Sequence, residues 1–250
     1  DTEGFVRRQS GAIYTDFRLA QHLAMAFKHG RSPKSLLDPA CGSGILLCAA
    51  TLSLAGDSRK RIDEILRDSI CGADLSEQAL RGAALSLCSL TGNRLVIKKL
   101  LGRLRQLDSL SGGLAGWPEF ERGFDAVIAN PPWERAKITR HEVLRISGVE
   151  RHYGDRYRGE SMEGIQDAKA RLRTYLEDLR ERFSLQGAGD PDLYKFFIEL
   201  ILTVTQPGGR ISLLVPAGLI RSQGTHALRQ ALFDKLGRLN LTIFDNKSRF

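Results

Sequence analysis

The chain has little cysteine and no long apolar run. Its cysteines, Cys41, Cys48, Cys71 and Cys88, form no CxxC pair and fall in segments expected as buried turn, helix or strand. This favours a reduced cytoplasmic protein without a zinc site over a disulfide-stabilised secreted domain. No apolar run is long enough to cross a bilayer, and no signal peptide is visible, although a chain that begins with Asp need not show its natural start.

Internal repeats and low-complexity tracts are also missing from the sequence. With 250 residues, 42% hydrophobic and 26% charged, the composition is that of one large globular domain with a full core.

The net charge of +8 is weak evidence for a polyanionic partner, because many basic proteins bind no nucleic acid. The positions of the cations along the chain are more informative than their sum. Residues 135–158 carry seven Lys or Arg against three acids. We assign these arginines to DNA backbone contacts, with a solvated face as the alternative. Residues 91–107 carry no acid. We interpret this segment, taken alone, as a solvated face. Its cations are Arg94, Lys98, Lys99, Arg103 and Arg105.

Short apolar segments alternate with helical patterns along the chain, which predicts a doubly wound, mostly parallel α/β sheet. Ligands of such a sheet bind at the carboxyl ends of the strands. The expected strands are 35–38, 69–73, 94–101, 124–130, 209–217 and 242–246. The expected helices begin near Gly44 and after the second strand, and another covers 192–205 before the stop signal QPGG.

Two further helical segments flank this pattern. Thr15 or Asp16 caps an N-terminal helix that ends at Gly30 and buries Leu19, Leu23 and Phe27. A polar insert, 134–190, separates the fourth and fifth strands and contains a helix at 165–183, with Arg173 and Glu177 at pairing distance. The segment 56–69 is expected as an added helix on the surface.

A glycine turn follows the first strand, in DPACGSG. Gly42 and Gly44 let a ligand approach the backbone, but Leu47 stands where a dinucleotide motif has its third glycine. Asp38 would repel a pyrophosphate and favours an ammonium group, whereas Asp74, at the end of the second strand, suits both hydroxyls of a ribose. These residues indicate a nucleoside without phosphates; the alternative is a plain turn with two helix caps.

Several of these segments, in this order, resemble one enzyme family. GAIYTD, DPACGSG, GADLSEQAL, LDSL and ANPPW are similar to motifs of the S-adenosylmethionine-dependent amino-group DNA methyltransferases, and closest to the N6-adenine type of restriction–modification and phage-defence systems. The segments DPDLYKFFIELIL, PGGRISLLVP and QGTHALRQALFD extend the resemblance over nearly the whole chain.

The resemblance implies S-adenosylmethionine as cofactor and assigns residues to each part of it. Tyr14 and Thr15 border the methionine end, and Asp38, Ala40, Gly42 and Gly44 hold the amino-acid part. Asp74 binds the ribose, Leu75 lies beside the adenine ring and Asp108 lies near its amino group. Two positions depart from the family pattern: Asp16 stands where Pro is usual, and Trp133 stands where Tyr or Phe is usual.

The catalytic tetrapeptide that the resemblance implies is Asn130, Pro131, Pro132 and Trp133. The side-chain carbonyl of Asn130 and the backbone carbonyl of Pro131 would accept the two N–H groups of an exocyclic amine, localise its lone pair and stabilise its developing charge. The indole of Trp133 would stack on a base taken out of the duplex. No metal is needed. The alternative is an ordinary turn with Trp133 in the core.

Other substrates and roles stay open at this point. The same acceptors would fit cytosine N4, an RNA base or a protein glutamine, although the cytosine enzymes usually have Ser in place of Asn130. A non-catalytic DNA-binding subunit of a defence complex is the alternative outside enzymes. We expect double-stranded DNA as partner, together with nuclease, helicase or specificity subunits or domains.

The domain organisation follows from the same resemblance. We expect residues 1–250 to be a methyltransferase catalytic domain interrupted by the insert 134–190. The chain ends inside an expected strand, so we expect a fragment of a longer protein, with the target-recognition domain beyond residue 250.

Overall fold

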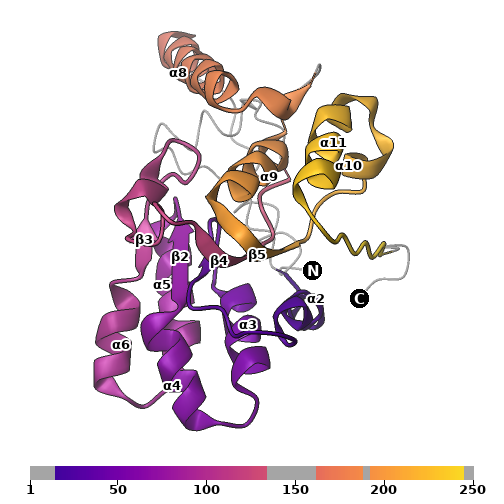
Figure 1. Ribbon diagram of the computed structural model, residues 1–250. Helices are drawn as coiled ribbons and strands as arrows, with labels where there is room; N and C mark the ends of the chain where they lie inside the picture. The colour runs from indigo at the N-terminus through magenta and orange to yellow at the C-terminus, as the bar shows by residue number, and fades with distance from the viewer. Residues whose placement is uncertain (1–14, 134–161, 188–191, 245–250) are drawn as a thin grey trace, which may run out of the picture.

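The computed structural model describes residues 15–133, 162–187 and 192–244, with side chains from residue 170 onward in the second range. At its centre lies a five-stranded sheet with the order β3-β2-β1-β4-β5 and parallel pairing throughout. Helices cover both faces (Figure 1). This confirms the predicted doubly wound α/β class. The strands are β1 (Leu36–Asp38), β2 (Ile70–Asp74), β3 (Leu104–Gln106), β4 (Phe124–Ala129) and β5 (Thr205–Leu213).

The described α-helices lie before, between and after the strands. They are α2 (Phe17–Ala24), α3 (Ile45–Ala55), α4 (Arg59–Asp68), α5 (Glu77–Cys88), α6 (Arg94–Leu101), α8 (Met162–Arg182), α9 (Leu193–Val204), α10 (Gly218–Arg221) and α11 (His226–Lys235). Short 3₁₀ turns occupy Met25–Phe27, Gly113–Gly116, Ser184–Gln186 and Gln223–Thr225.

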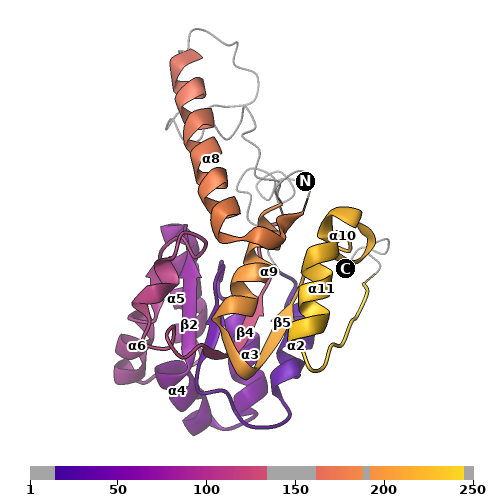
Figure 2. The same ribbon diagram turned by 45° about the horizontal axis from the view of Figure 1, so that its top comes forward.

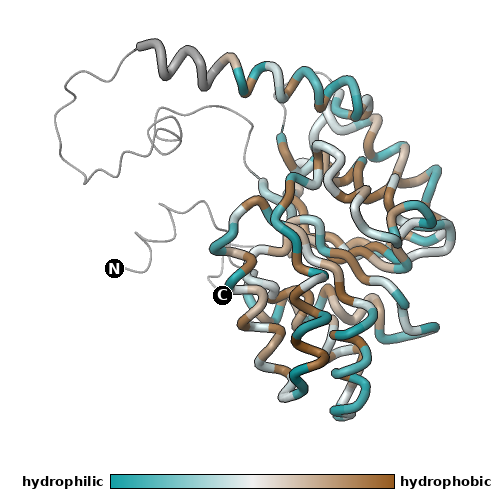
Figure 3. Tube along the Cα trace, turned by 90° about the vertical axis from the view of Figure 1, so that its left-hand side faces the viewer, coloured by the Kyte–Doolittle hydropathy of each residue, from teal (hydrophilic) through white to brown (hydrophobic). Residues whose placement is uncertain are grey.

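Alternate residues of the buried strands pack on opposite faces of the sheet, as the two-residue period of a strand requires. Leu36 joins the core under α2 to α6, whereas Leu37 joins the core under α9 and the end of α8. Figure 3 shows hydrophobic residues along the central strands, and hydrophilic residues recur along α8. Strands buried on both faces have continuous apolar sequences, which explains why β1, β2 and β4 were predictable.

The segment 94–101 is a helix, α6, so the prediction of a third strand there is wrong. Asn93 caps the helix, because its side chain accepts hydrogen bonds from the backbone N–H groups of Leu95 and Val96. Val96 and Leu100, four positions apart, are the buried residues of this helix. The third strand is the next segment, β3, which is short and only partly buried.

Two other strand predictions need correction. β5 spans Thr205–Leu213, so it begins directly after α9 and ends before the predicted limit of 217. Its pairing with β4 shifts between Phe124 and Ala126. The segment QPGG therefore lies within β5 opposite this irregularity, where a proline is tolerated in a sheet. Residues 242–244 belong to no strand, and 245–246 lie outside the described residues, so the predicted strand at 242–246 is wrong over its described part.

The predicted helices at the N-terminus and in the insert are present. The first ends earlier than predicted, because α2 stops at Ala24 and continues only as a 3₁₀ turn at Met25–Phe27, short of Gly30. Asp16 is the N-cap of α2, and Leu23 and Phe27 are buried, whereas Leu19 is half-buried. α8 covers the predicted insert helix except for residue 183, with Arg173 and Glu177 paired at 2.9 Å, and it extends away from the sheet (Figure 2).

The added helix between β1 and β2, α4, is more than a surface excursion. It buries Ile62, Ile65 and Leu66 in the core that it shares with α3 and α6. Among the described residues, no helix is long and apolar enough to cross a membrane.

Candidate active site

The residues predicted to carry function gather at one edge of the sheet. Asp38 and Asp74 end β1 and β2, Asp108 lies two residues after β3, and Asn130 comes directly after β4. Because all of these strands are parallel, their carboxyl ends meet at the same edge. The sheet therefore brings together four polar side chains that lie far apart in the sequence.

The glycine turn after β1 needs its glycines for two reasons. Gly42 and Gly44 have φ angles of +52° and +79°, a region that side chains with a Cβ rarely adopt. A Cβ on Gly44 would also lie 3.0 Å from Ala83 of α5. The turn thus packs directly on α5, and its backbone stays open to a ligand.

The carboxylate of Asp74 holds this turn. Its Oδ2 accepts a hydrogen bond from the backbone N–H of Gly42 at 2.9 Å, and its Oδ1 accepts one from Ser76 at 2.8 Å. Each oxygen keeps a further lone pair, which a ribose hydroxyl could use. Leu75, predicted to lie beside an adenine ring, is 66% exposed next to this acid.

Asp38 is buried with one of its oxygens unpaired. Oδ1 accepts a hydrogen bond from the backbone N–H of Ala40 at 3.1 Å, whereas Oδ2 has no hydrogen-bond partner among the described residues. Burial raises the pKa of this carboxyl to about 8, the Ala40 N–H opposes that rise, and the charge of Asp74 adds to it. Burial also raises the pKa of the neighbouring Cys41 thiol, and the negative charges of Asp38 and Asp74 raise it further.

The loop after β3 is tied to the glycine turn and to the insert. The hydroxyl of Ser109, which sequence reasoning missed, donates a hydrogen bond to the carbonyl of Pro39 at 2.6 Å. Asp108 Oδ1 accepts one from the backbone N–H of Leu110. On the other side, Arg182 of α8 donates to the carbonyl of Leu110 at 3.4 Å. Asp108 is thus held within the group, and the end of α8 packs over its loop.

Asn130 is held by one end of its amide. The side-chain nitrogen donates a hydrogen bond to the hydroxyl of Thr15 at 2.9 Å. The side-chain oxygen is buried and has no hydrogen-bond partner among the described residues. A buried carbonyl without a partner is costly, so an acceptor left open in this way indicates a donor that arrives with a ligand. Tyr14, the other predicted residue of this N-terminal motif, lies outside the described residues.

The rest of the tetrapeptide runs from the core to the surface. Pro131 is buried, Pro132 is half-buried and Trp133 is 37% exposed. The alternative that Trp133 belongs to the core is therefore wrong; the buried tryptophan is Trp117, which is 2% exposed. An exposed indole directly after Asn130 and the prolines can serve as a stacking surface.

The cations of 91–107 divide into two groups. Arg103 forms a largely buried ion pair with Glu119 at 2.7 Å, and the guanidinium of Arg105 lies 4.8 Å from the ring centre of Trp117. Both arginines are thus structural, which corrects the solvated-face interpretation for them. The exposed cations are Arg94, Lys98 and Lys99.

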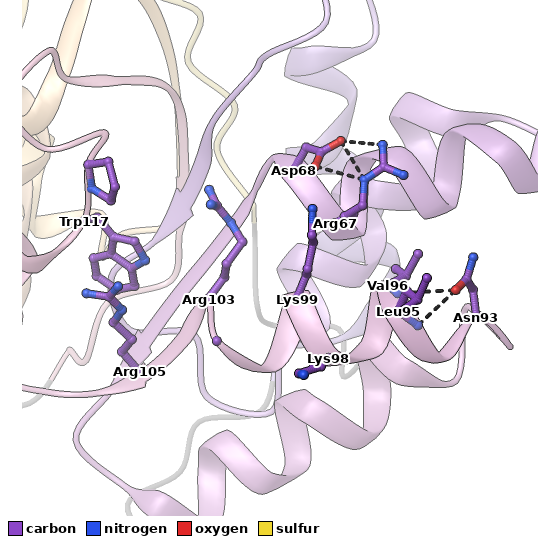
Figure 4. A pocket seen from close by; sticks show the side chains of 12 residues that line it. Arg67, Asp68, Asn93, Leu95, Val96, Lys98, Lys99, Arg103, Arg105 and Trp117 are labelled. Carbon is purple, nitrogen blue, oxygen red and sulfur yellow. Dashed lines mark hydrogen bonds and ion pairs between the residues drawn. The ribbon is translucent and has the colours of Figure 1, made fainter.

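Four of these cations, Lys98, Lys99, Arg103 and Arg105, line a hollow at the opposite edge of the sheet. Its volume is about 950 Å³, and it lies where β3 begins, between the ends of α4 and α6 (Figure 4). It is therefore separate from the carboxyl-edge group around Asn130. The cation-rich segment 135–158 lies outside the described residues.

The described residues contain no group of His, Cys, Asp or Glu side chains that could hold a metal ion. The carboxyl-edge group is therefore best described by its hydrogen-bonding chemistry: three acids, an open glycine turn, an amide oxygen without a partner and an exposed indole. Acceptors predominate, which suits a ligand rich in N–H and O–H groups or carrying an ammonium.

Comparison with known proteins assigns a family to this arrangement. Residues 68–250 match the model of a family described as Eco57I restriction-modification methylase. The matched range contains Asp74, Asp108 and Asn130 to Trp133, whereas the glycine turn precedes it. No curated protein matches the chain.

Solved structures share the fold at low sequence identity. A DrdV–DNA complex is similar over 91% of this chain and 22% of its own, with a TM-score of 0.61 and 14% identity. A nuclease-deletion mutant of the Type ISP enzyme LlaGI, bound to a DNA substrate mimic, is similar over 90% of this chain and 22% of its own, with a TM-score of 0.59 and 14% identity. The type I methyltransferase subunit from Streptococcus thermophilus is similar over 89% of this chain and 38% of its own, with a TM-score of 0.53 and 21% identity. The chain thus spans between about a fifth and two fifths of these proteins.

Proposed function

The chain belongs to the Eco57I restriction-modification methylase family, and from this premise we propose that it transfers a methyl group from S-adenosylmethionine to the N6 amine of adenine in DNA. The observation that carries the proposal is the side-chain oxygen of Asn130. It is a buried acceptor without a partner among the described residues, and it lies just past the carboxyl end of β4. An exocyclic amine would supply the donor that this oxygen lacks.

The residues present fit the proposed cofactor. Asp38 has a buried oxygen without a described partner, which suits the ammonium of the methionine part. The glycine turn has no side chain where the amino-acid part would approach, and Asp74 keeps lone pairs for the ribose hydroxyls. Asp108 is held nearby for the adenine amino group. When bound, S-adenosylmethionine supplies a methyl group on a sulfonium, an excellent leaving group.

The tetrapeptide would prepare the nucleophile. An adenine amine is a poor nucleophile, because its lone pair is delocalised into the ring. Asn130 Oδ1 and the backbone carbonyl of Pro131 would accept its two N–H bonds, shift the nitrogen towards tetrahedral geometry and stabilise the positive charge that develops there. Direct transfer then depends mainly on positioning, and neither a strong base nor a metal is required.

The exposed indole of Trp133 would receive the target base. An adenine inside a duplex cannot reach Asn130, so it must leave the stack, and an aromatic surface recovers about 1–3 kcal/mol of the lost stacking. Trp133 is exposed enough to offer such a surface and directly follows the two prolines. We therefore propose double-stranded DNA as the substrate.

We further propose that this chain works with other parts of a restriction system. The similar structures include a DrdV–DNA complex and a nuclease-deletion mutant of the Type ISP restriction-modification enzyme LlaGI bound to a DNA substrate mimic. This chain spans only part of each of them, so we propose that it acts as a catalytic domain together with nuclease, helicase or specificity subunits or domains. The insert arginines, 135–158, stay proposed as contacts to the DNA backbone.

The test is transfer of a labelled methyl group by the full-length protein to DNA that contains all four bases. Digestion of the product to nucleosides distinguishes N6-methyladenine from N4-methylcytosine. We expect label on adenine and a loss of at least about a hundredfold in Asn130→Ala, since an acceptor in the transition state would be lost. Transfer to cytosine would correct the base, and no transfer to any DNA by the folded protein would overturn the enzymatic function.

A further inference from the structure

We propose that Thr15 is a positioning residue for Asn130: its hydroxyl holds the amide nitrogen, so that the amide oxygen faces the target amine. This inference rests on the proposed methyl transfer. It assigns to Thr15 a role in the chemical step, in contrast to the cofactor contact at the methionine end that the sequence resemblance implies.

The contact joins two distant segments of the chain. Thr15 directly precedes Asp16, the N-cap of α2, and Asn130 directly follows β4, 115 residues after Thr15. The Asn130 side-chain nitrogen lies 2.9 Å from the Thr15 hydroxyl oxygen. Both groups are partly buried, so water competes less for this bond than it would at the surface.

The helix that follows Thr15 makes it a firm support. Asp16 caps α2, because its carboxylate accepts the backbone N–H of Arg18 at 2.8 Å, and this leaves the Thr15 hydroxyl available to Asn130. α2 buries Ala20 and Leu23 against α3, and the carbonyl of Leu23 accepts a hydrogen bond from Ser212 of β5 at 2.9 Å. Asp16 thus caps the helix through its side chain, which the usual proline could not do, and Thr15 is not needed as the cap.

The orientation of the amide decides what the target base meets. An asparagine side chain presents a carbonyl on one side and an N–H₂ group on the other. With the nitrogen held by Thr15, the oxygen is the end without a partner among the described residues. Rotation of the amide by half a turn would place N–H groups against the N–H groups of the incoming amine. An isosteric residue without a hydroxyl at position 15 would leave the amide nitrogen unsatisfied and free to rotate.

The two roles of Thr15 predict different kinetic changes, which Thr15→Val separates because valine has nearly the same shape. If Thr15 positions Asn130, kcat falls by about tenfold or more, since small misplacements in a reacting pair are costly. The calorimetric Kd for S-adenosylmethionine then changes by less than about twofold, because the ground-state contacts of the cofactor persist. Thr15→Ser keeps the hydroxyl and restores most of kcat.

Controls and a contrary outcome complete the kinetic test. Thr203→Val, an exposed change of the same kind on α9, should leave both constants unchanged. A raised Kd for S-adenosylmethionine in Thr15→Val, with an unaltered kcat at saturation, would assign Thr15 to the cofactor and overturn the proposal.

A second measurement keeps this inference distinct from the proposed function. In full-length protein labelled with ¹⁵N at asparagine, the Asn130 side-chain resonances are identified by their loss in Asn130→Ala. We expect Thr15→Val to shift them and Thr15→Ser to leave them close to their positions. If the wild type methylates no DNA, the proposed function fails, but this spectrum still tests the contact between Thr15 and Asn130. Asn130 resonances that do not shift in Thr15→Val would overturn the positioning role of Thr15.

Discussion

The backbone N–H of Gly42 donates a hydrogen bond to Asp74 Oδ2 at 2.9 Å, so the acid that ends β2 holds the turn that follows β1. The second oxygen of the same carboxylate caps the start of the next segment through Ser76. One side chain therefore fixes two backbone segments of the proposed cofactor site before any ligand binds. A change at Asp74 should affect cofactor binding both directly and through the turn.

Asp74→Ala should weaken S-adenosylmethionine binding by at least about tenfold, because it removes charged hydrogen bonds of about 1.5–3 kcal/mol each. Asp74→Asn keeps one oxygen acceptor and should lose less. DNA affinity should change little, since no proposed DNA contact involves Asp74. Calorimetry with the cofactor and fluorescence anisotropy with DNA measure the two effects. The matched control is Glu77→Gln, an exposed acid paired with Arg81 in the first turn of α5. An unchanged cofactor Kd in Asp74→Ala would remove Asp74 from the site.

Asp38 should release a proton when the cofactor binds. Burial raises the pKa of its carboxyl to about 8, so the group is mostly protonated at neutral pH. An ammonium placed against it favours the charged form, so binding should release roughly one proton, and affinity should rise with pH up to about that pKa. Calorimetry at neutral pH in buffers of different ionisation enthalpy counts the protons. Cofactor binding to Asp38→Asn should release no proton. If this variant releases as many protons as wild type, the released proton comes from another group.

The same carboxyl should make the ligand-free protein less stable as pH rises. Its folded-state pKa of about 8 lies above the ordinary value of 3.8, so the folded state binds the proton more tightly than the unfolded state does. Its contribution to the free energy of unfolding therefore falls as pH rises between these two values. Asp38→Asn should be more stable than wild type at the alkaline end of that range and should converge with it at the acidic end. Denaturation curves across this pH range measure the effect, and a constant difference would contradict it.

Gly44→Ala should destabilise the fold more than Gly112→Ala does. Both glycines lie in the left-handed region, with φ and ψ of 79° and 11° at Gly44 and of 97° and 6° at Gly112, so both changes introduce backbone strain of about 1–2 kcal/mol. At Gly44 the new Cβ would meet the backbone and Cβ of Ala83 in α5 at 3.0 Å, whereas at Gly112 it would meet only the tip of the flexible Arg182 side chain at 3.1 Å, which can move aside. We expect an extra loss of about 1–3 kcal/mol in the free energy of unfolding at Gly44, measured by chemical denaturation. Equal losses would show that α5 yields without cost.

Local patterns explain which features were predictable. β1, β2 and β4 are buried on both faces, so their apolar runs and the polar residues that end them are visible in the sequence. The segment 94–101 also has a short apolar run, Leu95–Ile97, and only the cap at Asn93 and the spacing of Val96 and Leu100 distinguish it as a helix. A short apolar run does not by itself decide between the two structures.

Contacts between distant segments were not predictable. The bonds from Asn130 to Thr15 and from Ser109 to Pro39 join residues 115 and 70 positions apart. The sequence indicates that each of these segments ends near the same sheet edge, but the pairing depends on side-chain directions that only the folded structure fixes. The unpaired oxygens of Asp38 and Asn130 follow from the same packing.

Trp133→Ala should lower kcat/KM for DNA methylation by between about fivefold and a hundredfold, which corresponds to the 1–3 kcal/mol of stacking that one base loses. The indole is 37% exposed, so the change removes little core packing, and the free energy of unfolding should stay nearly constant. Trp133→Phe keeps an aromatic face and should retain most of the activity. Phe233→Ala, at an exposed aromatic on α11, serves as control for loss of an exposed ring. With 2-aminopurine in place of the target base, Trp133→Ala should change the fluorescence of the bound complex while Phe233→Ala should not. Equal kcat/KM values for Trp133→Ala and wild type would mean that the extruded base stacks elsewhere.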